Sequence, residues 1–175
     1  MKAYSIFIPV LLASCTGRDA SRSDRPSHHY KAPDGSFSVD AAEDWTASID
    51  RGASLFVPAK GGKQTIVVRS STRHKELKEG HQASNDDLAN ATADVLGRLP
   101  SAAIEKRWKV SGDGLSGEAF SVRFTPQTVH QPYHRTHVVL FGKSKLFHVI
   151  YTAPADDTID ESALNEMVSS LREEV

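Results

Sequence analysis

Four of the eight histidines lie between residues 130 and 148, where their imidazole nitrogens could bind a divalent metal ion: His130, His134, His137 and His148. Neutral imidazole is a frequent zinc ligand, and a protein zinc site needs three or four ligands that converge on one point. Two neighbouring strands would have to bring these side chains together. The first question is therefore which of the four share a face of a sheet.

The apolar runs over 133–141 and 145–153 predict a β-hairpin that answers this question. A turn centred on Lys143 and Ser144 pairs Phe141 with Leu146, and the pairing continues along both strands. One face then carries His137, Val139, Phe141, Leu146, His148 and Ile150, and the other carries Val138, Leu140, Phe147, Val149 and Tyr151. Both faces are mostly apolar, so we expect these strands in the interior of a sheet that is covered on both sides.

In this register His137 and His148 are diagonal neighbours within reach of a shared metal ion, and His134 lies on the opposite face. Zinc or another divalent metal would need further ligands from elsewhere. Histidines beside apolar residues such as Val139 are also common as half-buried, hydrogen-bonded side chains. A metal or small-ligand carrier that uses His137 and His148 is thus one alternative, and a pair without a cofactor is the other.

Cys15 is the only cysteine of the chain and follows an apolar N-terminal segment. Lys2 supplies a positive charge, and residues 3–13 form an apolar run too short to span a bilayer, which is typical of an export signal. The stretch Leu12-Ala13-Ser14-Cys15 resembles the bacterial lipobox, and this resemblance implies cleavage before Cys15 and a diacylglycerol on its sulfur. We therefore expect residues 1–14 to be a lipoprotein signal peptide and Cys15 to carry a lipid anchor.

Residues 16–29 contain no large apolar side chain. A segment of this composition cannot bury enough surface to offset its chain entropy. We expect residues 15–29 to be a flexible tether between the lipid and a single globular domain over residues 30–175. Thr16 after the cysteine, in place of aspartate, is compatible with sorting to the outer membrane. The expected location is therefore the bacterial cell envelope, at the periplasmic side of the outer membrane.

Composition and motifs argue against nucleic-acid binding and catalysis. The chain is 39% hydrophobic and 25% charged, and its formal net charge of −1 leaves no basic excess for nucleic acid. Ser116 lacks the Gly-x-Ser-x-Gly motif of a nucleophile elbow. The paired acids Asp86-Asp87 and Asp156-Asp157 precede predicted helices, where we expect them to cap the helix starts. No catalytic residue is expected, and we expect the chain not to be an enzyme.

Hydrophobic periodicity predicts the elements that hold these residues. Strands are predicted over 36–39, 53–57, 64–70, 103–110, 115–125, 133–141 and 145–153, and a loop over 71–82. A helix with Leu88, Ala91, Val95, Leu96 and Leu99 on one face is predicted before Pro100, and a second one over 160–173 with Leu164, Met167, Val168 and Leu171. Strands joined by short turns predict an antiparallel sheet with the helices packed on it, in the α+β class.

Two stretches resemble the PsbP-like family. Gly35-Ser36-Phe37-Ser38-Val39 followed by Trp45 is similar to its glycine-phenylalanine strand and tryptophan, and residues 148–157 (HVIYTAPADD) before a closing helix are similar to its C-terminal signature. The family includes PsbP of photosystem II, a Ran-binding import factor and bacterial lipoproteins of the LpqN and DcrB type. The resemblance implies an α-β-α sandwich around a central antiparallel sheet, a role in binding or scaffolding other proteins, and no catalytic residues.

These observations lead to one expected function. The chain is expected to be a lipid-anchored envelope protein whose PsbP-like domain acts as a non-catalytic binding or scaffolding module. Its expected partners are membrane lipid, through acylation of Cys15, and another envelope protein, with no nucleic acid. No motif identifies the residues that would contact the protein partner.

Overall fold

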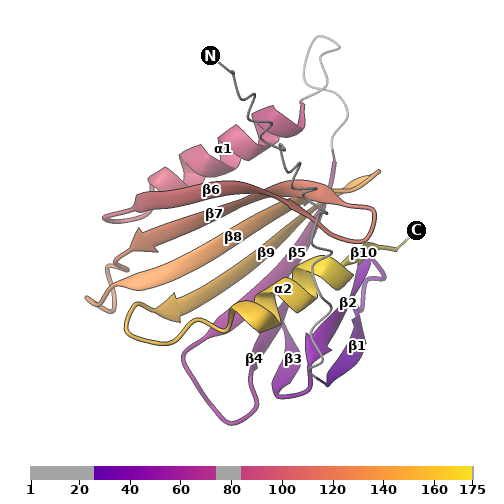
Figure 1. The fold of residues 1–175 in the computed structure, drawn as a ribbon, viewed down its shortest axis with the longest axis horizontal. Helices are drawn as coiled ribbons and strands as arrows, with labels where there is room; N and C mark the ends of the chain where they lie inside the picture. Colours follow the sequence, from indigo (N-terminus) through magenta and orange to yellow (C-terminus); the bar gives the residue numbers. More distant parts are fainter. Residues whose placement is uncertain (1–25, 74–83, 175) are drawn as a thin grey trace, which may run out of the picture.

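The computed structural model describes residues 26–73 and 84–174. These residues form ten strands and two helices. The strands are β1 (Ser27–Lys31), β2 (Phe37–Ala42), β3 (Trp45–Asp50), β4 (Ala53–Pro58), β5 (Thr65–Thr72), β6 (Ala103–Ser111), β7 (Ser116–Phe124), β8 (Tyr133–Phe141), β9 (Lys145–Pro154) and β10 (Arg172–Glu173), and the helices are α1 (Asn85–Gly97) and α2 (Glu161–Ser170). The predicted α+β class is confirmed (Figure 1).

Seven strands form the central sheet, in the order β3-β4-β5-β9-β8-β7-β6. All neighbours in this sheet are antiparallel, as expected from the short turns. The short turns do not predict that β5 and β9 are neighbours. Strand β9 lies between β8 and β5, and this pairing places Ile150 opposite Val67, although the two residues are far apart in the sequence. This non-local pairing joins the N-terminal and C-terminal strands into one sheet (Figure 1).

The predicted hairpin register is confirmed. Phe141 pairs with Leu146, Val139 with His148, and His137 with Ile150. Because alternate side chains of a strand point to opposite faces, this register alone decides which residues face α1 and which face α2.

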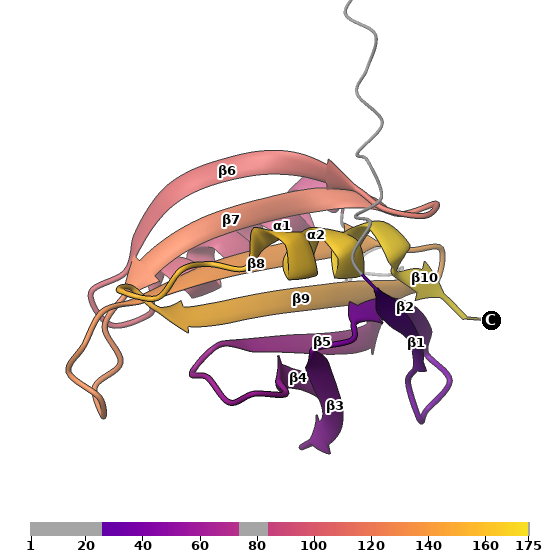
Figure 2. The same cartoon turned by 60° about the horizontal axis from the view of Figure 1, so that its bottom comes forward.

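Helix α2 covers one face of the central sheet. Its predicted apolar side chains are all buried there: Leu164, Met167 and Val168 within the helix and Leu171 just after it. They pack in one cluster with Trp45 and other apolar side chains of the sheet. A second sheet, in the order β1-β2-β10, flanks the same helix, which contacts β2 (Figure 2).

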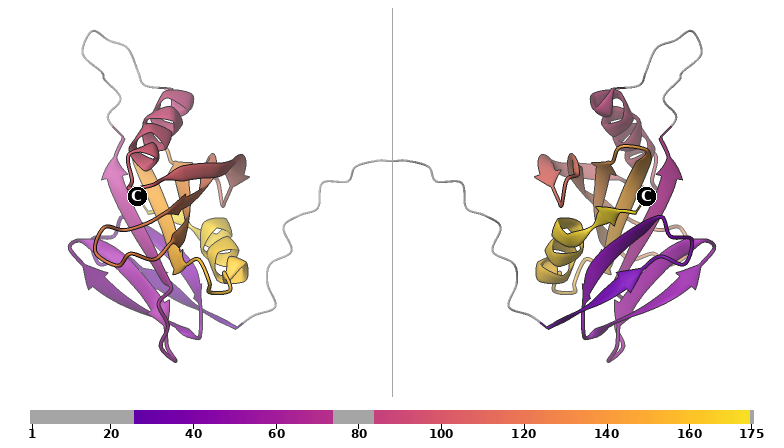
Figure 3. Two further views of the ribbon diagram at one scale, coloured as in Figure 1. Left: turned by 90° about the vertical axis from the view of Figure 1, so that its left-hand side faces the viewer. Right: turned by 90° about the vertical axis from the view of Figure 1, so that its right-hand side faces the viewer.

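Helix α1 covers part of the opposite face. Ser84 caps it through a capping box with Asp87, in which the Ser84 hydroxyl accepts from the Asp87 N–H and the Asp87 carboxylate accepts from the Ser84 N–H. The helix packs against β6, β7 and β8 (Figures 1 and 3). Its buried residues Ala89 and Leu96 join a second apolar cluster with Phe120, Val122, Val139 and Phe141. Helices on both faces confirm the expected α-β-α sandwich.

The apolar stripe predicted for α1 was partly wrong. Val95 is 62% exposed, and the buried side chains of the helix are Ala89, Thr92 and Leu96. These three lie at i, i+3 and i+7, so they share one face of a helix with 3.6 residues per turn. The small residues Ala89 and Thr92 allow the helix to approach the sheet closely, and hydropathy alone does not select them.

Four segment boundaries differ from the prediction. Strand β3 was not predicted, because all its residues after Trp45 are exposed and give no apolar alternation. Helix α2 ends at Ser170 rather than at residue 173, and the chain continues as β10, which pairs Arg172 with Ser38. Asp156 and Asp157 do not cap α2, whose N-cap is Asp160. The last three residues of the expected tether, 27–29, belong to β1 and pair with β2.

Two predictions lie outside the described residues. Cys15 with its signal peptide falls in residues 1–25, and most of the predicted loop falls in residues 74–83. Within residues 26–73 and 84–174, neither helix has the length and apolar character needed to cross a membrane.

Candidate functional site

The side chains of His137 and His148 contact each other on the face of the sheet against which α1 packs. Nε2 of His137 lies 2.9 Å from Nδ1 of His148, within hydrogen-bond distance, and the ring planes are at 80° to each other. His137 is 8% exposed and His148 is half-buried. The sheet positions them on the inner strands β8 and β9, where their diagonal relation follows from the hairpin register.

Their surroundings keep both rings neutral. Burial, and then the positive charges of His148 and Arg135, lower the pKa of His137 to about 3. Burial, and then the charge of Arg69, lower the pKa of His148. One ring must therefore donate its N–H to the bare nitrogen of the other. Nδ1 of His137 is buried without a hydrogen-bond partner, so this ring cannot satisfy both of its nitrogens.

The described part of the chain does not complete a metal site around this pair. His134 lies on the opposite face, and its Nδ1 is 3.8 Å from a carboxylate oxygen of Glu105. Nowhere among the described residues do three His, Cys, Asp or Glu side chains gather closely enough to hold a metal ion. The metal-carrier alternative therefore rests on two ligands that already bind each other, and it remains a prediction.

Next to the histidines, part of the sheet face beside α1 is open. Leu55, Val67 and Ile150 form a row across β4, β5 and β9, and all three are half-buried. They belong to neither of the two apolar clusters of the core. Helix α1 lies over β6, β7 and β8, and within residues 26–73 and 84–174 no helix covers β9, β5, β4 and β3 on this side.

Two arginines flank this apolar row. In the strand register Arg69 of β5 lies opposite His148, and Arg135 of β8 lies opposite Thr152. Arg69 is exposed and Arg135 is half-buried. The guanidinium of Arg135 lies 4.7 Å from the ring centroid of Phe124, and its Nε donates to the Thr152 hydroxyl at 3.4 Å. Burial lowers the pKa of Arg135. Within the described residues, no carboxylate forms an ion pair with either arginine.

We call this surface the open face and define it by Leu55, Val67, Arg69, Arg135, His148, Ile150 and Thr152. His148 was predicted from the sequence as a candidate ligand, but the two arginines and the apolar row were not. The apolar positions of 64–70 were visible in the sequence. Their neighbours in the sheet come from β9, however, and no local pattern predicts that pairing.

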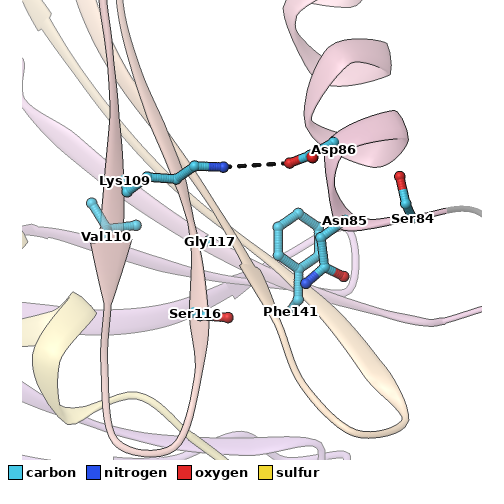
Figure 4. A pocket seen from close by; sticks show the side chains of 8 residues that line it. All are labelled: Ser84, Asn85, Asp86, Lys109, Val110, Ser116, Gly117 and Phe141. Atoms are coloured by element: carbon cyan, nitrogen blue, oxygen red, sulfur yellow. Dashed lines mark hydrogen bonds and ion pairs between the residues drawn. The ribbon is translucent and has the colours of Figure 1, made fainter.

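A cavity of about 400 Å³ lies at the other end of the same sheet face, beside the start of α1 (Figure 4). Asp86 of the helix and Lys109 of β6 reach across it and form an ion pair of 3.4 Å. Ser84 and Ser116 supply its hydroxyl groups, but the Ser84 hydroxyl already serves the helix cap, where it also donates to the Asp87 carboxylate at 2.8 Å. No histidine is among its lining residues, so neither serine has an imidazole beside it in this cavity.

Glu118 of β7 lies buried near this cavity, at 3% exposure. Its carboxylate forms ion pairs with Arg107 and Lys109 of the edge strand β6. Hydrogen bonds from these two cations, first that of Arg107, hold the pKa of Glu118 below its usual value, although burial acts in the opposite direction. Arg107 also donates to Asn90 at 2.9 Å, so this network joins β6, β7 and α1. Its role is to attach the helix to the sheet.

Comparisons with known proteins show the fold of this chain. No protein-family model matches the sequence, and no curated protein does. LpqN of Mycobacterium tuberculosis, described as involved in cell envelope biogenesis, matches with a TM-score of 0.63 and 13% identity, over 86% of this chain and 91% of LpqN. Cyanobacterial PsbP from Synechocystis sp. PCC 6803 matches with a TM-score of 0.53 and 16% identity, over 93% of this chain and 98% of that one.

A protein from Bacteroides thetaiotaomicron VPI-5482 also matches, with a TM-score of 0.59 and 15% identity over 84% of this chain. This chain spans about half, 48%, of that protein's length. The three matches confirm the PsbP-like fold expected from residues 35–45 and 148–157. At these identities they show the fold alone.

Proposed function

We propose that this chain is a non-catalytic binding module of the bacterial cell envelope, attached to the membrane by lipid on Cys15. The observation that carries the binding role is the open face, where the half-buried side chains of Leu55, Val67 and Ile150 lie beside two arginines that have no carboxylate partner among the described residues. A sheet face of this composition is typical of a surface that another molecule covers.

Three further observations support this function. In the cavity beside the start of α1 no histidine lies among the lining residues, so its two serines have no imidazole that could activate them as nucleophiles. LpqN, which has the same fold, is named for cell envelope biogenesis. The stretch Leu12-Ala13-Ser14-Cys15, which resembles a lipobox, supports the same compartment. A metal carrier that uses His137 and His148 is the alternative proposal.

The anchor is tested by expressing the full chain in a Gram-negative bacterium and separating its membranes. We expect the wild-type protein to enter the detergent phase of a Triton X-114 extract, and intact-mass spectrometry to show cleavage before Cys15 with added acyl mass. The Cys15→Ser variant is expected in the aqueous phase. Equal partitioning of the two proteins, or an unmodified Cys15, would overturn the anchor.

A further inference from the structure

The open face and the part of the sheet covered by α1 both combine apolar side chains with cations. Under α1, the apolar residues Phe120 and Val139 lie beside the cations Arg107 and Lys109 of β6. On the open face, Val67 and Ile150 lie beside the cations Arg69 and Arg135. Under α1 the buried carboxylate of Glu118 also binds both cations, whereas on the open face neither arginine has a carboxylate partner, and no helix covers them, among the described residues.

Helix α1 shows what kind of element this composition accepts. Its buried side is apolar, with Ala89 and Leu96 against the sheet. Its polar side contacts the cations of β6: Asp86 forms an ion pair with Lys109 at 3.4 Å, and the Asn90 side chain accepts a hydrogen bond from Arg107 at 2.9 Å. The helix is thus acidic and amphipathic, and charge complementarity as well as apolar burial holds it on the sheet.

The dimensions of the open face also fit a helix. The strands β3, β4, β5 and β9 lie side by side, and three strand spacings of about 4.8 Å give a width of about 14 Å. An α-helix with its side chains is about 10 Å wide. One further helix therefore fits beside α1 on this face.

The charges of the open face favour an acidic occupant. Arg69 is exposed and Arg135 is half-buried, and neither has a carboxylate partner among the described residues. The strand register places a single carboxylate on this part of the face, that of Asp50 at the end of the edge strand β3, and it lies 4.0 Å from Arg51. A half-buried guanidinium gains most from a partner that supplies a carboxylate.

We propose that the open face binds an acidic amphipathic α-helix of a partner protein, with the apolar side of that helix on Leu55, Val67 and Ile150 and its carboxylates on Arg69 and Arg135. This inference rests on the proposed binding function and names the partner class and the surface. Arg135, which packs on Phe124, anchors one end of the helix, and Arg69 guides its approach from solvent.

The test uses the full chain in detergent micelles and three labelled peptides of about five helical turns. The first carries Leu at i, i+3, i+4 and i+7 with Asp and Glu beside them, the second replaces its acids by Lys, and the third is a scrambled form of the first. Fluorescence anisotropy is expected to show the acidic helix binding about tenfold more tightly than the other two. Equal binding of the three peptides, or no binding of the first, overturns the inference.

Variants locate the binding surface. Arg69→Glu is expected to weaken binding of the acidic helix about tenfold, and Arg123→Glu to leave it unchanged. Arg123 is a matched control because it is also exposed on an inner strand, β7, but lies on the opposite face of the sheet. Circular dichroism checks that both variants are folded. An unchanged affinity in Arg69→Glu overturns the inference.

Two other molecules could occupy the open face, and measurements on variants distinguish them from the acidic helix. Binding of phosphatidylglycerol vesicles that is lost in Arg69→Glu, with no binding of the acidic helix, would assign the face to a lipid surface and overturn the inference. Dimerisation that Val67→Lys abolishes would assign it to a second copy of this chain, with the same consequence. Membrane retention through Cys15, measured on the same variants, reports on the proposed function separately, because neither Arg69 nor Val67 takes part in the anchor.

Discussion

His137 and His148 form a hydrogen bond of 2.9 Å between two imidazole rings on neighbouring inner strands. A proton on either ring would place a positive charge beside Arg135 and Arg69 in a site largely removed from water, and this is why the pKa of both histidines is lowered. The pair is therefore compatible with the folded state only while both rings are neutral.

Acid is expected to destabilise the protein through this pair. The folded pKa of His137, about 3, lies below its ordinary value of 6.5, so the unfolded chain binds the proton more tightly. Stability is then fully present above pH 6.5 and is lost as the pH falls towards 3. For His137 alone the free energy of unfolding should fall by about 2 kcal/mol between pH 7 and pH 5. Urea unfolding at the two pH values measures it.

A double variant tests the origin of this pH dependence. His137→Leu with His148→Leu is expected to remove most of the loss between pH 7 and pH 5, since neither side chain can take up a proton. His130→Asn is the control, because His130 is exposed and asparagine tolerates its positive φ of 52°. A pH dependence that survives in the double variant would show that other groups cause it.

Zinc is expected to bind weakly or not at all at the histidine pair. The two ring nitrogens that face each other are occupied by their hydrogen bond, and the described residues supply no third ligand. Isothermal calorimetry of the full chain at pH 7.5 should therefore show no stoichiometric, high-affinity site. A one-to-one site that is lost in the double leucine variant would favour the metal-carrier function.

Glu118→Gln is expected to loosen the contact between α1 and the sheet. The change leaves Arg107 and Lys109 without the buried carboxylate that binds both. The free energy of unfolding should fall by about 1–3 kcal/mol, and amide exchange should rise in α1 before it rises in α2. Glu105→Gln is the matched control: Glu105 is an exposed carboxylate of the same strand β6, where we expect a change of less than about 0.5 kcal/mol. Equal effects of the two variants would contradict the role of Glu118.

Tyr151→Phe is expected to weaken the start of α2. The buried Tyr151 hydroxyl donates to the Gln64 side chain at 2.7 Å and accepts from the Asp160 N–H at 2.9 Å, where Asp160 is the N-cap of the helix. Its removal takes away both of these hydrogen bonds and should cost about 1–2 kcal/mol in urea unfolding. Tyr133→Phe is the control, since the Tyr133 hydroxyl forms no hydrogen bond with the described residues. An unchanged free energy of unfolding in the Tyr151→Phe variant would show that water replaces the hydroxyl.

Gly117→Ala is expected to be among the most damaging small substitutions. A Cβ at Gly117 would clash with the carbonyl oxygen of Val139, so β7 and β8 would have to separate. We expect a loss of about 2–4 kcal/mol, measured by thermal and urea unfolding. Gly97→Ala in α1 is the matched control, because nothing lies within 4 Å of its added Cβ, and it should stabilise the helix slightly. A tolerated Gly117→Ala would contradict the close approach of these strands.

The local features of this protein could be predicted from its sequence alone. The pattern over 133–153 predicted the register that pairs Phe141 with Leu146, and hence the diagonal relation of His137 and His148. Other local patterns in the sequence predicted the apolar side of α2 and the α+β class. These features depend on residues close together in the chain, where the strand period of two and the helix period of 3.6 act directly.

How the two halves of the sheet join could not be predicted from the sequence. The pairing of β5 with β9 places Val67 beside Ile150 and Arg69 beside His148, and so creates the open face. The side of α1 that packs on the sheet, with Val95 in solvent, depends in the same way on the strands below it. Contacts between distant segments are selected by the shape and burial of the whole core, and no repeating pattern within one segment carries that information.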